Sequence, residues 1–158
     1  MSRYRVLAIV SLAVALTAGV TWTFAQPRTM DLRAQDYIDI QQLDAAYNHA
    51  LDASDADRFT SLFTQYWSLA GNTGHEALAQ VIRGTEQMCQ GNWRHLYSNL
   101  TITPTAEGAN GSSFLLAYDV TTKPATITNT GVYTDKLVKT PSGWRFKERT
   151  FANDAQPR

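Results

Sequence analysis

Residues 41–63 read QQLDAAYNHALDASDADRFTSLF, and this stretch decides the fold. Apolar residues recur in its first half at intervals of three and four positions, namely Leu43, Ala46, Tyr47, Ala50 and Leu51. On a helix with 3.6 residues per turn this spacing gathers them into one stripe, which predicts an amphipathic helix packed on a core. Ser54 is followed three residues later by Asp57, a pairing typical of a helix N-cap. We therefore expect a break at residues 53–54 and a second helix after it, with Asp55 and Asp57 as its caps.

Two aspartates are expected at the ends of the first helix. Asp36 is a candidate cap at its start. Asp52 is expected at its end, where the helix dipole disfavours a negative charge. Asp52 should therefore find a partner elsewhere in the fold or stay solvated.

The rest of the chain changes from helical to strand periodicity. A short strand is expected near Tyr66–Trp67, and a third helix over His75–Arg83 with a further turn through Cys89. From Trp93 onward the apolar residues alternate with polar ones in four runs, Arg94–Thr103, Ser112–Thr122, Ile127–Lys139 and Gly143–Phe151. Helices followed by a meandering antiparallel sheet predict an α+β domain.

The N-terminus has the pattern of a secretory signal. Residues 1–25 contain two arginines, an uncharged apolar run and a small residue at the end. We expect cleavage near Gln26, a mobile lead-in over residues 26–35, one domain over 36–153 and a tail over 154–158. The predicted location is therefore the periplasm or the exterior. Because the apolar run is long enough to span a bilayer, an uncleaved membrane anchor stays open as the alternative.

Composition argues against several classes of function. The 14 basic and 14 acidic residues balance, and two of the arginines lie in the predicted signal, so nothing indicates a nucleic-acid or anionic-lipid surface. Cys89 is the single cysteine, which excludes an internal disulfide. With three scattered histidines, His49, His75 and His95, no spacing resembles a zinc site, and we predict no metal. His49 is expected to face solvent, and His75 to start a helix.

Five segments in this order resemble the SnoaL-like branch of the nuclear-transport-factor-2-like superfamily. They are YNHALD with the following DADRFTSLF, GHEALAQVI at 74–82, RHLYSNLTI at 94–102, AYDV at 117–120 and GVYTDKLVKTPSGWRFKERT at 131–150. The resemblance implies a cone, in which the helices close a curved antiparallel sheet around a mostly apolar cavity. Members of this superfamily include isomerases, dehydratases, epoxide hydrolases, cyclases and binding modules, so the fold leaves the activity open.

Within the superfamily, the scytalone dehydratase and bile acid 7α-dehydratase branch offers the nearest chemical precedent. The resemblance implies that Tyr47, Asp52 and His95 are the catalytic residues, with Arg149 as a looser match for a late arginine. Tyr118, Asn99 and Trp67 join Arg149 as candidate substrate-binding residues. No cofactor is implied.

These residue types suit the elimination of water beside a carbonyl group. Histidine, whose reference pKa is about 6.5, can take the α-proton near neutral pH. A carboxylate can hold the imidazole in the required tautomer, and a tyrosine hydroxyl can donate to the developing oxyanion. On β periodicity, His95 faces opposite to Leu96 and Leu100, either into the cavity or to solvent.

Two features complicate this assignment. Tyr47 and Asp52 lie five residues apart, so on a regular helix they point about 140° away from each other. Asp52 reaches His95 only if the helix ends there, and Asp44 is the possible substitute. In addition, where SnoaL-like chains commonly read Phe-Thr-x-Asp-Gly, this chain reads FTQYW at 63–67. Nor does the sequence show the close acid–arginine–acid set of the epoxide hydrolases, which makes that mechanism a weak candidate.

Two hypotheses for the function follow. The first is a cofactor-independent lyase or isomerase that acts on a hydrophobic hydroxy-carbonyl or polycyclic small molecule. The alternative is an exported small-molecule-binding or assembly module that uses the same cone without chemistry. Under either hypothesis we expect a homodimer through the sheet, and no membrane contact unless the N-terminal segment is uncleaved.

Overall fold

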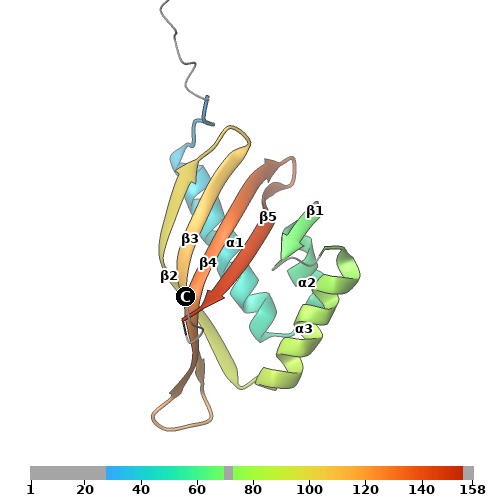
Figure 1. The fold of residues 1–158 in the computed structure, drawn as a ribbon, viewed down its shortest axis with the longest axis vertical. Coiled ribbons are helices and arrows are strands. Elements are labelled where there is room, and N and C mark those ends of the chain that lie inside the picture. Colours follow the sequence, from blue (N-terminus) through green and yellow to red (C-terminus); the bar gives the residue numbers. More distant parts are fainter. Residues whose placement is uncertain (1–27, 70–72, 155–158) are drawn as a thin grey trace, which may run out of the picture.

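A computed structural model describes residues 28–69 and 73–154 of the 158-residue chain (Figure 1). Its helices are α1 (Ala34–Asp52), α2 (Ala56–Ser61) and α3 (His75–Cys89), and its strands are β1 (Phe63–Leu69), β2 (Trp93–Pro104), β3 (Gly108–Asp119), β4 (Thr126–Thr140) and β5 (Gly143–Asn153). The predicted signal peptide lies outside the described residues, so export stays a prediction. No helix of the described part is long and apolar enough to span a membrane.

The strands form one curved, unclosed sheet in the order β1-β5-β4-β3-β2. Strands β2 to β5 are antiparallel, whereas β1 runs parallel to β5. Figure 1 shows α1 running across one face of the sheet, with α2 and α3 beyond its β1 edge. The predicted α+β class is confirmed, and the parallel edge strand is the departure from an antiparallel meander.

The predicted apolar stripe of α1 does face the core. Leu43, Tyr47, Ala50 and Leu51 are buried together with side chains of α2, β1, α3, β4 and β5, among them Phe59, Phe63, Leu78, Leu137, Trp144 and Phe146. Burial of apolar area contributes roughly 25 cal/mol per Å², which makes this contact the main source of stability for α1. The helix is therefore fixed against the sheet along its whole length.

The chain breaks after α1 as expected, and one of the two aspartates predicted as caps does cap α2. The N-cap is Asp55, whose side-chain Oδ1 accepts a hydrogen bond from the Arg58 N–H at 3.0 Å. Ser54 instead has a φ of 54°, in the left-handed region that lets the chain leave α1. The prediction of Asp55 as a cap is confirmed, whereas Asp57 lies in the first turn of α2 and Ser54 makes the turn itself instead of capping the helix.

Asp36 lies in the first turn of α1 rather than at its cap. The helix begins at Ala34, and the Asp36 carboxylate accepts hydrogen bonds from the Arg33 N–H, the Lys139 ammonium and the Trp144 indole N–H. These bonds hold the pKa of the Asp36 carboxyl well below its ordinary value. The same contacts tie the start of α1 to β4 and β5.

A bulge in β2 changes which side chains face the core. The pairing of β2 with β3 shifts between Ser98 and Thr101, where Asn99 has a φ of 53°. Before the bulge, Leu96 is half exposed and faces away from His95, as expected. After it, Leu100 packs against the core, so the prediction that Leu100 also faces opposite to His95 was wrong.

Candidate functional site

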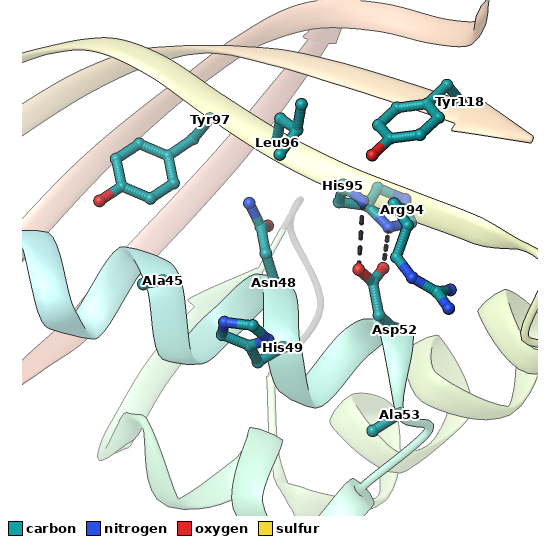
Figure 2. Close-up of a pocket in the computed structure, with 10 residues that line it drawn as sticks. All are labelled: Ala45, Asn48, His49, Asp52, Ala53, Arg94, His95, Leu96, Tyr97 and Tyr118. Atoms are coloured by element: carbon teal, nitrogen blue, oxygen red, sulfur yellow. Dashed lines mark hydrogen bonds and ion pairs between the residues drawn. The ribbon is translucent and has the colours of Figure 1, made fainter. Parts of the chain in front are cut away.

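The last residue of α1 and the third residue of β2 form a hydrogen-bonded acid–histidine pair. The His95 Nδ1 lies 2.6 Å from the Asp52 Oδ1, and the His95 backbone N–H donates to the Asp52 Oδ2 at 3.2 Å (Figure 2). Because α1 ends at Asp52, its carboxylate reaches β2, which a residue in mid-helix facing away could not do. Asp52, and not Asp44, is the partner of His95.

This pairing defines which ring nitrogen of His95 can act as a base. A carboxylate at Nδ1 stabilises the tautomer in which Nδ1 carries the proton, and that tautomer leaves the lone pair on Nε2. Nε2 makes no hydrogen bond to any residue that the structure describes. The side chains are 7% exposed for His95 and 14% for Asp52, so the pair is sheltered but reachable. It has the arrangement of a general base with its orienting acid.

The pair opens onto a pocket of about 590 Å³ between α1 and β2 (Figure 2). Residues of α1, the turn after it, β2 and β3 line it, namely Ala45, Asn48, His49, Asp52, Ala53, Arg94, His95, Leu96, Tyr97 and Tyr118. A volume of 300–1,000 Å³ with a few polar groups is typical of small-molecule sites. The pocket is therefore large enough for a bicyclic compound.

Of the other predicted site residues whose side chains the structure describes, Tyr118 is the one that lines this pocket. Tyr47, Asn99 and Arg149 are not among its lining residues. Asn99 is exposed at the bulge of β2. Trp67 belongs to β1, but its side chain lies outside what the structure describes.

Tyr47 is buried in an aromatic cluster under α1. Its ring centroid lies 4.8 Å from that of Phe59, 5.7 Å from that of Phe146 and 5.8 Å from that of Tyr133. Burial raises the pKa of the Tyr47 hydroxyl, and the nearby Arg149 charge opposes this. The structure thus places Tyr47 in the core, apart from the Asp52–His95 pair.

Arg149 is the centre of a second charged cluster, which is fully buried. Its guanidinium donates to both carboxylate oxygens of Asp135 at 2.7 Å and also to Asp44. The rings of Tyr47, Tyr133 and Phe146 surround its Cζ at 4.1–4.4 Å. Burial alone would lower the pKa of Arg149, but the hydrogen bonds and charge of Asp135 outweigh burial and raise it. Burial raises the pKa of Asp44 despite the guanidinium.

This cluster is a close acid–arginine–acid set, so the prediction that the chain lacks one was wrong. Asp44, Asp135 and Arg149 are widely separated along the chain, and no local motif joins them. Counting the β4–β5 hairpin register outward from its turn would pair Asp135 with Glu148, and the irregularity between Lys136 and Leu137 shifts Asp135 opposite Arg149, so a regular register would not have revealed this contact. None of the three lines the 590 Å³ pocket.

The sequence analysis missed four polar residues of the pocket, namely Asn48, His49, Arg94 and Tyr97. Asn48 lies one helical turn before Asp52, so the two share a face of α1. Tyr97 lies two residues after His95 on β2 and its hydroxyl donates to the Gln41 carbonyl at 2.9 Å. Asn48 and Tyr97 could have been found by extending the helical period from Asp52 and the strand period from His95.

Among the described residues, no group of three or more His, Cys, Asp or Glu is placed to hold a metal ion.

Solved structures share this fold across most of their length. A Nostoc punctiforme protein of unknown function with a cystatin-like fold is 22% identical, with a TM-score of 0.69 over 80% of this chain and 97% of that one. A candidate scytalone dehydratase from Novosphingobium aromaticivorans is 25% identical, with a TM-score of 0.65 over 78% and 90%. ActVI-ORFA from Streptomyces coelicolor is 14% identical, with a TM-score of 0.68 over 78% and 98%.

The sequence itself matches a family model. No curated protein sequence matches this chain. The model of the SnoaL-like domain, in contrast, matches residues 32–150, which include all the helices and strands described above except the end of β5. The chain therefore belongs to the SnoaL-like domain family.

Proposed function

We propose that this protein is a cofactor-independent lyase of the dehydratase type that acts on an enolisable β-hydroxy carbonyl compound. The observation that carries the proposal is the Asp52–His95 pair, with Nδ1 and Oδ1 2.6 Å apart, on the wall of a pocket of about 590 Å³. The likeness to a candidate scytalone dehydratase, at 25% identity, supports the same class of reaction.

The reaction needs one proton to move and one C–O bond to break. His95 Nε2 takes the proton from the carbon beside the carbonyl, and the C–H electrons form an enolate. Asp52 stabilises the imidazolium that results. The enolate then re-forms the carbonyl as the β-hydroxyl group leaves, a C=C bond forms, and the imidazolium proton converts the departing hydroxide to water. General-base catalysis of this kind contributes about 10²–10⁴-fold in rate.

A bicyclic β-hydroxy ketone tests the proposal directly. Loss of water from 3-hydroxy-1-tetralone gives 1-naphthol, which fluoresces, and exchange of the α-protons in D₂O reports the base even where elimination is slow. We expect the wild-type protein to accelerate both, and His95→Gln, which keeps the volume but not the basicity, to lose both. Asp57→Asn, an exposed position on α2, is the control. Equal exchange in wild-type and His95→Gln protein would overturn the assignment of the base.

We also propose that the protein assembles as a homodimer through the outer face of the sheet. Leu96 is 50% exposed and Phe114 is 52% exposed, on the paired strands β2 and β3, facing away from the core. Exposed apolar patches of this kind commonly mark interfaces. Light scattering should give a dimer for the wild type and a monomer for the Leu96→Thr, Phe114→Thr double variant, and a monomeric wild type would refute the proposal.

A further inference from the structure

Asn48 is a buried pocket residue whose side chain has no hydrogen-bond partner among the residues that the structure describes. It is 5% exposed and projects from α1 toward β2 (Figure 2). Its Oδ1 is sealed from solvent and accepts no hydrogen bond from the described residues, and its Nδ2 donates to none of them. The amide therefore offers its Nδ2–H donors to the pocket beside the Asp52–His95 pair, while Oδ1 lies on the sealed side.

An unpartnered buried amide needs a physical reason. Leaving one buried polar group unsatisfied costs about 1–3 kcal/mol, and native proteins contain few such groups. Five buried side-chain atoms in the described part of the chain lack a partner, on Asp44, Asn48, Thr64, Ser113 and Arg149. Of these five residues, Asn48 is the one that lines the 590 Å³ pocket. Its Nδ2 has no partner among the described residues and, unlike Oδ1, is not one of these sealed atoms, so Nδ2 is the Asn48 atom that a ligand in the pocket can reach.

We infer that the Asn48 amide binds the carbonyl oxygen of the substrate and donates a hydrogen bond to the enolate formed when His95 removes the α-proton. The inference rests on the proposed function and assigns the oxyanion-binding role within it. Asn48 lies one turn from Asp52, about 6 Å along the helix axis, so a ligand beside His95 also lies beside Asn48. A donor placed where charge develops favours the enolate.

The other hydroxyl and amide groups near the pair are less suited to this role. Tyr47 is adjacent to Asn48 in sequence but points about 100° around the helix, into the buried cluster of Arg149. The Tyr97 hydroxyl already donates its proton to the Gln41 carbonyl. Arg94, His49 and Tyr118 also line the pocket, but Arg94 and His49 are exposed and Tyr118 is half-buried. Arg94 already donates to the Gly91 and Trp93 carbonyls. Asn48 is the pocket donor that is buried and makes no hydrogen bond to a described residue.

The binding of 4-nitrophenol tests the inference without requiring turnover. Its phenolate form imitates an enolate oxygen, and its visible spectrum distinguishes phenolate from phenol. We expect the wild type to bind the phenolate, and Asn48→Leu to bind it about 10–100-fold more weakly, the loss of one buried hydrogen bond to a charged group. Asn48→Asp should bind it more weakly still, because it removes the donor and adds a negative charge. Gln42→Leu, an exposed amide on α1 outside this pocket, should bind as the wild type does.

Urea denaturation of the same variants separates a binding role from a structural one. Because Asn48 makes no hydrogen bond within the described structure, Asn48→Leu should be at least as stable as the wild type. Failure of the wild type to bind the phenolate, equal binding by Asn48→Leu, or marked destabilisation of Asn48→Leu would each overturn the inference. If the wild type binds the phenolate through Asn48 but never forms 1-naphthol or exchanges α-protons, the oxyanion site stands and the lyase proposal fails.

Discussion

Helix α1 holds two acid clusters against the sheet, and they differ in access to solvent. Asp52 pairs with His95 at the end of the helix, on the wall of the pocket. Asp44, eight residues earlier, accepts a hydrogen bond from Arg149, which also donates to Asp135. These three side chains are fully buried. Both clusters bring opposite charges within hydrogen-bond distance. Only the first places a basic imidazole nitrogen beside space for a ligand, so access to the pocket together with histidine in place of arginine separates a candidate catalytic pair from a structural one.

The position along α1 produces this difference. Eight residues advance the helix by about 12 Å. At Asp44, the strands β4 and β5 lie opposite the helix, and Tyr47, Tyr133 and Phe146 close over the charges. At Asp52, the helix ends opposite β2, which is an edge strand of the sheet in the described part of the chain. The same helix thus stabilises the core at one point and presents a reactive pair at the other.

Of the variants that test this difference between the two clusters, the one that removes the buried Arg149 cation should lose the most stability. Arg149→Met leaves Asp44 and Asp135 without their shared partner in the core. Breaking a buried ion pair in this way costs about 3–5 kcal/mol of folding free energy, so we expect a large loss in the urea midpoint or failure to fold. In the triple variant Arg149→Met, Asp44→Asn, Asp135→Asn, no uncompensated charge remains, and much of the stability should return. A triple variant as unstable as the single one would show that the charges are not the cause.

Neutralising the acid at the open end should impair catalysis and spare the fold. Asp52→Asn keeps the shape of the side chain but no longer stabilises the imidazolium or specifies the tautomer of His95. We expect kcat to fall about 10²–10⁴-fold with 3-hydroxy-1-tetralone, with little change in KM or in the urea midpoint. Nitrogen NMR of the His95 ring should show the change of tautomer, and Asp57→Asn serves as the control. A variant with normal kcat would remove Asp52 from the mechanism.

The buried acid should also give the stability a characteristic pH dependence. Burial raises the pKa of folded Asp44 above its unfolded value of 3.8, so in the window just above 3.8 the folded protein retains a proton that the unfolded chain has lost. The contribution of Asp44 to stability is complete below 3.8 and declines as pH rises through that window. Asp44→Asn should remove this decline, measured by urea denaturation at a series of pH values. An unchanged slope would show that Asp44 is ionised at the same pH in both states.

The sequence predicted the elements better than it predicted their contacts. The helical stripe of residues 43–51 and the alternation after Trp93 are local periodicities, and the described helices and strands follow them closely. The Asp52–His95 contact was anticipated on condition that the helix ends at Asp52, which depends on the φ of Ser54. The bulge at Asn99 and the meeting of Asp44 with Arg149 depend on strand register and tertiary packing, which no local pattern specifies.

Removal of the Tyr47 hydroxyl should have the smallest effect on stability and turnover. The resemblance to the dehydratases and the geometry of this structure assign different roles to Tyr47. Resemblance makes its hydroxyl a catalytic donor, whereas in this structure its ring packs on Phe59 and Phe146 beside the buried Arg149. If Tyr47 is a core residue, Tyr47→Phe should cost about 1 kcal/mol of folding free energy, the value of one hydroxyl contact, and change kcat less than about threefold. Turnover of 3-hydroxy-1-tetralone and urea denaturation measure both. A loss of kcat comparable to that of Asp52→Asn, with unchanged stability, would mean that Tyr47 reaches the substrate and that α1 moves when the ligand binds.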